Sequence, residues 1–121
     1  MKNILVVDDH PEIREMLQQI LTGAGYKVTT AENGLRLLSI IQADKIDLIL
    51  LDIMMQWISG TDLCRSIRKN KKLLHTKIFF LSAKNQIADI RAGYDAGCDE
   101  YITKPFDPNL LLEKINRAFE K

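Results

Sequence analysis

The 121-residue sequence predicts an α/β fold in which helices cover both faces of a doubly wound, five-stranded parallel sheet. Short apolar runs alternate five times with longer segments whose apolar residues recur at helical spacing, which is the pattern of consecutive strand–helix units. The length suits one domain, because domains contain about 100–200 residues. The composition, 46% hydrophobic and 27% charged, supplies enough apolar side chains for a single core.

The first two predicted strands differ in polarity. Ile4–Val7 is apolar throughout, which is typical of a strand buried on both faces. A helix follows, in which Pro11 suits the first turn and Gly23 or Gly25 suits the end. The next strand, Lys27–Ala31, carries polar residues, and we therefore place it at an edge of the sheet.

The middle of the chain contains two predicted helices on either side of another buried strand. Asn33 turns the chain into the second helix, and Leu48–Leu51 is a second fully apolar strand that ends at Asp52. Gly60 opens the third helix, which finishes in the basic run Arg68–Lys72. Cations suit a helix C-terminus, and we expect this run to face solvent. The apolar positions of the two helices are Leu37, Leu38, Ile41, Leu63 and Ile67.

The last part of the chain repeats the alternation. Ile78–Leu81 is the third buried strand and leads to Ser82, and a helix follows from about Asn85 to Ala96. Gly93 costs this helix about 1 kcal/mol relative to alanine; it either makes the helix pliable or lets a neighbour pack closely. A short polar strand, Asp99–Thr103, precedes a last helix with apolar positions at Leu111, Leu112, Ile115, Ala118 and Phe119.

The polarity of the strands predicts their order. The first, third and fourth strands are the most apolar and are expected at the centre of the sheet, with the second and fifth at its edges. The resulting order is 2-1-3-4-5, as in flavodoxin-like doubly wound folds.

Charge and residue usage exclude several classes of protein. Seventeen Lys and Arg against sixteen Asp and Glu give a net charge of +1, which argues against nucleic-acid binding by a basic surface and against disorder. No apolar run approaches the roughly 18–20 residues that span a bilayer, and the first apolar run is too short for a signal peptide. Cys64 and Cys98 have no metal-ligand spacing and are expected to be reduced and partly buried. We therefore expect a cytoplasmic protein without membrane contacts.

Polar side chains follow the predicted strands. Asp8 and Asp9 come after the first strand, Asp52 after the third, Ser82 after the fourth and Lys104 after the fifth. The carboxyl ends of parallel strands share one edge of the sheet, where ligands of doubly wound folds bind. Taken singly, the acids and the serine could cap helices, and the lysine could be a solvated loop residue. Their coincidence on ordered strand ends predicts a functional site.

The chemistry of these side chains points to a cation and a phosphoryl group. Two like charges about 4 Å apart repel by about 4 kcal/mol at an effective dielectric of 20, so three clustered carboxylates would repel strongly unless they are protonated or bridged by a cation. A hard divalent cation is the simpler of these two solutions. Mg²⁺, or Mn²⁺ in its place, suits carboxylate and phosphate oxygens. A carboxylate beside a metal, a hydroxyl and an ammonium group suits phosphoryl transfer, with Asp52 as the nucleophile.

The sequence resembles the receiver domain of two-component response regulators from Ile4 to Phe119, so that residues 1–121 are predicted to form one receiver domain. The segments that carry the resemblance are Val7-Asp8-Asp9, Leu51-Asp52-Ile53-Met54-Met55, Leu81-Ser82-Ala83, Gly97-Cys98-Asp99-Glu100-Tyr101 and Lys104-Pro105-Phe106.

The resemblance implies a phosphoacceptor and a metal site. Asp52 would take a phosphoryl group from the phosphohistidine of a sensor histidine kinase or a histidine phosphotransfer protein. Asp9, Asp52 and the backbone carbonyl of Met54 would bind Mg²⁺ directly, and Asp8 would act mainly through a bound water. Lys104 would pair with a phosphoryl oxygen.

The resemblance also implies a switch. Ser82 would hydrogen-bond a phosphoryl oxygen, and Tyr101 would turn inward when this hydroxyl moves; the alternative for Tyr101 is a half-exposed aromatic residue of an edge strand. Ala83 matches a small residue that leaves the site accessible, and the Lys104–Pro105 peptide bond is cis in the family. The surface of the fourth helix, fifth strand and fifth helix would then change and control a partner protein or a fused output domain.

Two alternative functions remain at this point. One is a Mg²⁺-dependent aspartyl-phosphate phosphohydrolase of the haloacid-dehalogenase type, but such enzymes carry a second Asp two residues after the nucleophile, where this chain has Met54. The other is an interaction module that is not phosphorylated, which the intact acidic set disfavours. We therefore expect no enzyme activity beyond self-phosphorylation from a phosphodonor and slow autodephosphorylation.

The chain departs from the family at two places. The loop Gln56-Trp57-Ile58-Ser59-Gly60 stands where Pro-Gly-x-Asp-Gly is usual, and its apolar pair either packs against the adjacent helix, which we favour, or contacts a partner. Leu110 and Lys114 stand where an acid and an Arg are usual in receivers that dimerise through their last helices. We expect a monomer or a weak, phosphorylation-dependent dimer.

Overall fold

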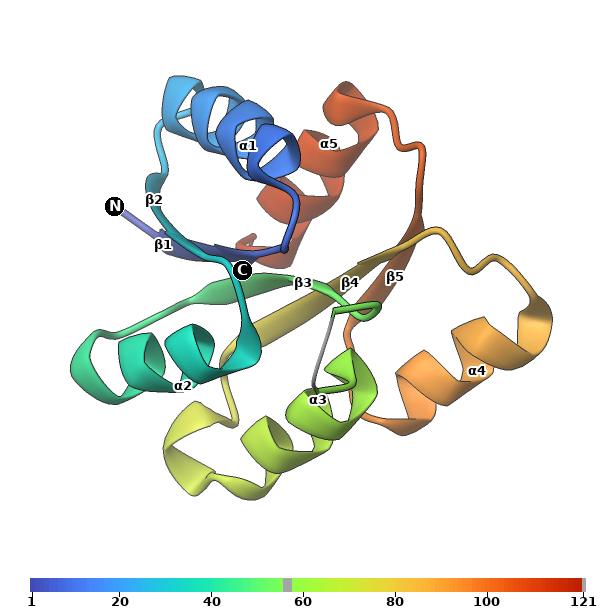
Figure 1. Cartoon of the computed structure of the whole chain (residues 1–121). Coiled ribbons are helices and arrows are strands. Elements are labelled where there is room, and N and C mark those ends of the chain that lie inside the picture. The colour runs from blue at the N-terminus through green and yellow to red at the C-terminus, as the bar shows by residue number, and fades with distance from the viewer. Residues whose placement is uncertain (56–57, 121) are drawn as a thin grey trace.

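The computed structural model describes residues 1–55 and 58–120 and contains one parallel sheet with the strand order β2-β1-β3-β4-β5, as predicted. The strands are β1 (Asn3–Val7), β2 (Lys27–Ala31), β3 (Leu48–Asp52), β4 (Lys77–Ser82) and β5 (Glu100–Thr103). The helices are α1 (Pro11–Gly23), α2 (Gly34–Ala43), α3 (Gly60–Lys69), α4 (Ile87–Asp95) and α5 (Pro108–Ala118), with a short 3-10 helix, η1 (Lys71–Leu73). Helices α1 and α5 cover one face of the sheet, and α2, α3 and α4 cover the other (Figure 1).

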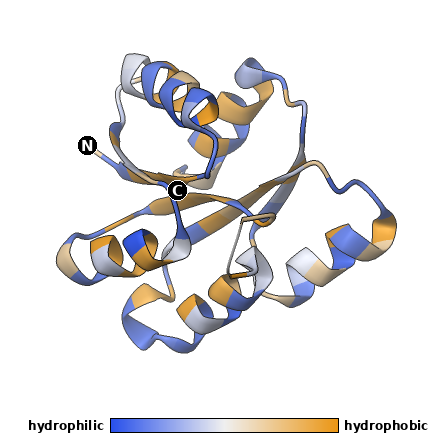
Figure 2. Ribbon diagram, viewed as in Figure 1, coloured by the Kyte–Doolittle hydropathy of each residue, from blue (hydrophilic) through white to orange (hydrophobic). Residues whose placement is uncertain are grey.

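The core consists of two layers, one on each face of the sheet. The central strands are apolar except at some of their end residues (Figure 2), and their alternate side chains enter opposite layers. One layer contains Val6, Leu50 and Phe79 with apolar side chains of α1 and α5. The other contains Ile49 and Phe80 with apolar side chains of α2 and α3. This double burial explains why β1, β3 and β4 read as continuous apolar runs.

The helices begin and end where local chemistry favours it. The Asn33 side chain accepts a hydrogen bond from the Arg36 backbone N–H at 2.9 Å and caps α2, and Asp107 caps α5 in the same way through Asn109. Gly25, with φ of +97°, follows α1 in a conformation that suits glycine. The structure differs from prediction at α4, which begins at Ile87 and not near Asn85, because the backbone of Gln86 is still extended.

Arg68 does not face solvent as the sequence suggested. Its guanidinium donates hydrogen bonds to the Gly97 carbonyl at 2.8 Å, to the Thr76 carbonyl at 2.7 Å and to the Asp99 carboxylate at 2.6 Å. The Asp99 carboxylate also accepts from the Ile78 backbone N–H. The end of α3 is thereby tied to the segments that enter β4 and β5.

Cys64 and Cys98 are free, as expected, and are buried more completely than the partial burial that was predicted. Burial raises the pKa of the Cys64 thiol to about 11 and that of Cys98 to about 12, so both stay protonated near neutral pH. Within the described residues, none of the helices combines the length and the apolar character needed to cross a bilayer.

Candidate functional site

The sheet brings the predicted polar residues to one edge. Asp8 directly follows β1, Asp52 and Ser82 are the last residues of β3 and β4, and Lys104 directly follows β5. The parallel register places these strand ends side by side, with Asp52 opposite Leu81 and Ser82 opposite Thr103. The first, third, fourth and fifth strands thus deliver the side chains that the sequence pointed to.

Asp8 and Lys104 form the best-buried ion pair of the site. Asp8 is 1% exposed, and its Oδ2 accepts a hydrogen bond from the Lys104 ammonium group at 3.0 Å. The backbone N–H of Lys104 donates to the Ser82 carbonyl at 2.8 Å, and its peptide bond to Pro105 is cis, as the resemblance implied. The ammonium group also reaches the end of β3, where it lies 3.6 Å from the Asp52 Oδ2.

Asp52 lies beside this pair and is 3% exposed. Its Oδ1 accepts a hydrogen bond from the Met54 backbone N–H at 3.0 Å, and its Oδ2 lies 3.6 Å from the Lys104 Nζ. Burial raises the pKa of the Asp52 carboxyl group, and the neighbouring Asp8 and Asp9 carboxylates add to this rise. The Met54 hydrogen bond and Lys104 oppose it. On balance the pKa of the Asp52 carboxyl group lies above its ordinary value, with burial as the largest cause.

Asp9 and His10 lie beside Asp8 and Asp52, and we call this part of the sheet edge, formed by Asp8, Asp9, His10 and Asp52, the acidic edge. The His10 Nδ1 lies 2.9 Å from the Asp8 Oδ1 and 3.1 Å from the Asp9 Oδ1. The hydrogen bond with Asp8 and the charges of both carboxylates raise the pKa of the imidazole. Asp8, Asp9, His10 and Asp52 offer ligand atoms that all lie within 4.8 Å of one another. The sequence interpretation missed His10, although its position directly after Asp9 and before Pro11 was a usable signal.

Ser82 and Tyr101 are joined through one residue of the following loop. The Ser82 Oγ accepts a hydrogen bond from the Lys84 backbone N–H at 3.0 Å, and the Tyr101 hydroxyl donates to the Lys84 carbonyl at 2.8 Å. Ser82 therefore does not cap α4, which begins five residues later. Tyr101 is intermediate in exposure, and its ring packs edge-on against Phe80 with centroids 6.2 Å apart.

Gly93 gives Tyr101 room against α4. A Cβ atom at position 93 would lie 2.7 Å from the Tyr101 Cδ2 and 3.2 Å from the Phe80 Cδ2. Of the two explanations for a glycine inside this helix, the structure supports close packing by a neighbour.

The unusual loop after Met55 is described only in part. Gln56 and Trp57 lie outside the described residues. A Cβ atom on Gly34 would lie 2.7 Å from the Ile58 Cγ2, so Ile58 contacts the start of α2, although it remains 37% exposed. For the pair as a whole, packing against a helix stays a prediction. A Cβ atom on Gly60 would lie 2.4 Å from the Ile53 Cα, which explains why this position of the loop is a glycine.

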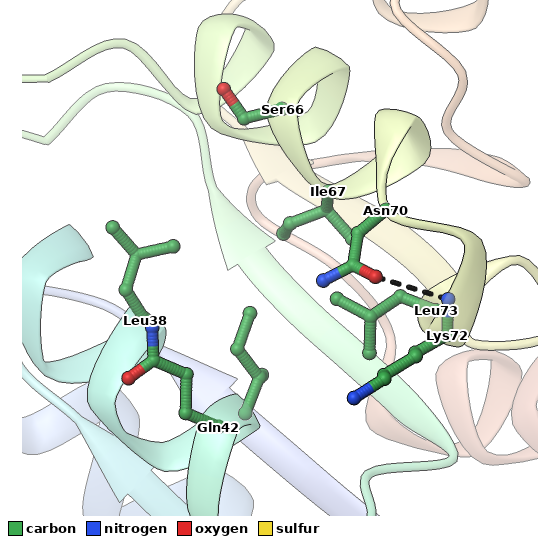
Figure 3. Close-up of a pocket in the computed structure, with 8 residues that line it drawn as sticks. Leu38, Gln42, Ser66, Ile67, Asn70, Lys72 and Leu73 are labelled. Atoms are coloured by element: carbon green, nitrogen blue, oxygen red, sulfur yellow. Dashed lines mark hydrogen bonds between the residues drawn. The ribbon is translucent and has the colours of Figure 1, made fainter.

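A hollow of about 260 Å³ lies away from the acidic edge, between α2 and the end of α3 (Figure 3). Leu38, Ile67 and Leu73 supply apolar walls. The Asn70 side chain at its rim already accepts a hydrogen bond from the Lys72 backbone N–H at 3.0 Å. None of the described residues that line it carries a carboxylate, so the acidic site predicted for the strand ends does not lie there.

Comparison with known proteins identifies the family. Residues 4–116 match the family described as the response regulator receiver domain. The chain is 39% identical over 118 residues to the probable transcriptional regulator ycf29 of Pyropia yezoensis, covering 98% of this chain and 53% of that protein. It is 38% identical over 120 residues to the phosphate regulon transcriptional regulatory protein PhoB of Pseudomonas aeruginosa, covering 99% and 52%. The chain spans about half the length of the curated relatives it matches.

Solved structures show the same fold over nearly the whole chain. The chemotaxis protein CheY4 of Vibrio cholerae superposes with a TM-score of 0.92 at 30% identity, covering 98% of this chain and 99% of that one. The response regulator protein TrrA of Thermotoga maritima, solved in complex with Mg²⁺ and BeF, gives a TM-score of 0.86 at 41% identity, covering 98% and 100%. The chain therefore belongs to the receiver domains of response regulators, the phosphorylation-activated switches of two-component signal transduction.

Proposed function

We propose that this receiver domain is phosphorylated on Asp52. The observation that carries the proposal is the placement of the Asp52 carboxylate, which ends a central strand, is almost fully buried, and lies beside both the Lys104 ammonium group and the other acids. The Lys104 Nζ, which pairs with Asp8, also lies 3.6 Å from the Asp52 Oδ2. Its positive charge therefore faces the position at which a phosphoryl group on Asp52 would add negative charge.

The phosphoryl donor is a phosphohistidine of a sensor histidine kinase or of a histidine phosphotransfer protein. A carboxylate oxygen of Asp52 forms a bond to phosphorus while the phosphorus–nitrogen bond of the donor breaks. The imidazole leaves with the electron pair of that bond and takes up a proton. The product is an acyl phosphate, whose extra charge faces the ammonium group of Lys104.

The donor set at this edge fits a hard divalent cation, because it offers three carboxylates within reach of one another. Asp9, Asp52 and the backbone carbonyl of Met54 would hold Mg²⁺ or Mn²⁺ directly, and Asp8 would act mainly through a water. When bound, the cation supplies positive charge for the phosphoryl oxygens. Without such an ion the carboxylates of Asp8, Asp9 and Asp52 would repel one another, which supports a role for a cation at this site.

Ser82 and Tyr101 would transmit the change. The Ser82 hydroxyl accepts a hydrogen bond from Lys84 and still has its own hydrogen to donate to a phosphoryl oxygen. Movement of Ser82 toward Asp52 would shift Lys84, whose carbonyl holds the Tyr101 hydroxyl. Tyr101 in turn contacts α4 at Gly93, so the shift would reach the surface of α4, β5 and α5. Exposed apolar residues at this surface include Ile87, Tyr94 and Leu110.

The output is a partner protein or a further domain of a longer chain. Relatives about twice as long are named as transcriptional regulators, which supports an output in transcription carried by another part of such a protein. We propose no direct contact of this domain with nucleic acid, and a monomer or a weak dimer that depends on phosphorylation.

The phosphorylated state should be long-lived compared with an enzyme intermediate. The residue two positions after Asp52 is Met54, whose side chain is half exposed and cannot act as a general acid or base. This supports self-phosphorylation and slow autodephosphorylation over turnover as a phosphohydrolase.

The test is labelling of the intact chain by acetyl phosphate with Mg²⁺, followed by mass spectrometry. The wild type should gain one phosphoryl group, and Asp52→Asn should gain none. Asp62→Asn, which alters an exposed carboxylate on α3, is the matched control and should be labelled like the wild type. Labelling of Asp52→Asn at the rate of the control would overturn the assignment.

A further inference from the structure

We propose that His10 is an additional ligand of the divalent-cation site at the strand ends, so that the site offers an imidazole nitrogen beside its carboxylates. This inference rests on the metal site of the proposed function and extends it to the class of ion that the site prefers. His10 is placed by the chain itself, one residue after Asp9, and is the N-cap residue of α1.

The first argument is the spacing of the ligand atoms. Metal ions with six ligands at about 2.1 Å hold neighbouring ligand atoms about 3.0 Å apart. The His10 Nδ1 lies at this spacing, 3.1 Å, from the Oδ1 of Asp9, a direct ligand of the proposed site, and it lies 2.9 Å from the Asp8 Oδ1. Asp8, Asp9, His10 and Asp52 each offer one ligand atom, and these four atoms all lie within 4.8 Å of one another.

The second argument is that little rearrangement is needed. The His10 backbone N–H donates to the Asp8 Oδ1 at 2.9 Å, and the following Pro11 restricts the His10 backbone to the extended conformation that it has, with φ of −93° and ψ of 114°. The imidazole is therefore already turned toward the carboxylates. The neutral tautomer that carries its proton on Nε2 presents Nδ1 as a ligand atom.

A nitrogen ligand changes which ion is preferred. Mg²⁺ favours oxygen ligands, whereas an imidazole suits Co²⁺ and Zn²⁺, which also bind most N/O sites more tightly than Mn²⁺ or Fe²⁺ do. His10 should therefore increase the affinity of the site for imidazole-accepting first-row ions and leave the affinity for Mg²⁺ nearly unchanged.

A different role for His10 makes the opposite prediction. A protonated imidazole that only neutralises Asp8 and Asp9, as Lys104 neutralises Asp8 through its other oxygen, would compete with every cation. Removal of the imidazole would then strengthen the binding of Mg²⁺ and Co²⁺ alike.

The experiment is calorimetric titration of the untagged full chain with MgCl₂ and separately with CoCl₂. His10→Ala should weaken Co²⁺ binding by about 10-fold or more, since substitutions around a metal site typically lower metal affinity by about 10–100-fold. The same variant should change Mg²⁺ affinity by less than about threefold. His75→Ala, which removes the other, exposed histidine, is the matched control and should change neither. In the wild type, Zn²⁺ should also shift the ¹⁵N resonance of the His10 Nδ1, whereas Mg²⁺ should not.

The outcomes separate this inference from the proposed function. Asp9→Ala and Asp52→Asn should weaken the binding of both ions. If they do so while His10→Ala binds Co²⁺ like the wild type, or binds both ions more tightly, His10 is not a ligand and the acidic site stands. If neither aspartate variant changes binding, the metal site of the proposed function is itself wrong.

Discussion

Replacement of Gly93 by alanine should destabilise the domain and displace Tyr101, although alanine is the better helix former. The new Cβ atom would lie 2.7 Å from the Tyr101 Cδ2, 3.1 Å from its Cε2 and 3.2 Å from the Phe80 Cδ2. Phe80 is fully buried and cannot move away, whereas Tyr101 is partly exposed and can. We therefore expect the tyrosine ring to swing toward solvent.

The magnitude follows from what Tyr101 loses. Its hydroxyl hydrogen bond to the Lys84 carbonyl is worth about 1 kcal/mol, and its edge-on contact with Phe80 is worth about 0.5–1.5 kcal/mol. Alanine returns about 1 kcal/mol through helix propensity. The free energy of unfolding should therefore fall by about 0.5–1.5 kcal/mol, the difference between these contributions.

Gly23→Ala provides the matched control, because Gly23 is also helical and a Cβ atom there would meet nothing within 4 Å. That variant should gain up to about 1 kcal/mol. Urea denaturation of both variants measures the contrast, and the ring resonances of Tyr101 report its displacement. If Gly93→Ala is stabilised as much as Gly23→Ala and the Tyr101 resonances do not change, the close-packing argument is refuted.

Four further predictions concern the site and the core. In the absence of metal, Asp52→Asn should raise the free energy of unfolding at pH 7 by about 0.5–2 kcal/mol, because burial raises the pKa of this carboxyl group and its charge opposes folding. Since the folded-state pKa lies above the ordinary value of 3.8, the gain should shrink as the pH falls from 7 toward 3.8, and a gain that grew instead would contradict this reasoning. MgCl₂ should raise the melting temperature of the wild type but not of Asp9→Ala; an equal rise in both would remove Asp9 from the site. Gly60→Ala should cost more than about 2 kcal/mol in urea denaturation, because its Cβ would meet the backbone of Ile53 at 2.4 Å, and an unchanged midpoint would show that the loop yields easily. Arg68→Met should lower the free energy of unfolding by about 2–4 kcal/mol, because it leaves two backbone carbonyls without a partner and removes the ion pair with Asp99. The exposed Lys69→Met should change it by no more than about 0.5 kcal/mol. Similar losses in both variants would contradict the stabilising role of the three Arg68 hydrogen bonds.

The sequence alone determined the architecture and most of the site. A strand buried on both faces must be apolar throughout, so β1, β3 and β4 were visible as short runs, and the polar edge strands followed by contrast. Because the strands are parallel, the residues after them had to meet at one edge. Asp8, Asp52, Ser82 and Lys104 could thus be assigned to one site without any contact being known.

The tertiary structure decided how distant residues meet. The contact of Arg68 with Gly97 joins residues 29 positions apart, and no local pattern distinguishes that arginine from the lysines beside it. The link from Ser82 through Lys84 to Tyr101, and the space at Gly93 that admits the tyrosine ring, depend in the same way on the packing of α4 against β5. Periodicity reports which face of an element is buried, but side-chain partners are chosen by loop geometry and close packing, which only the folded chain provides.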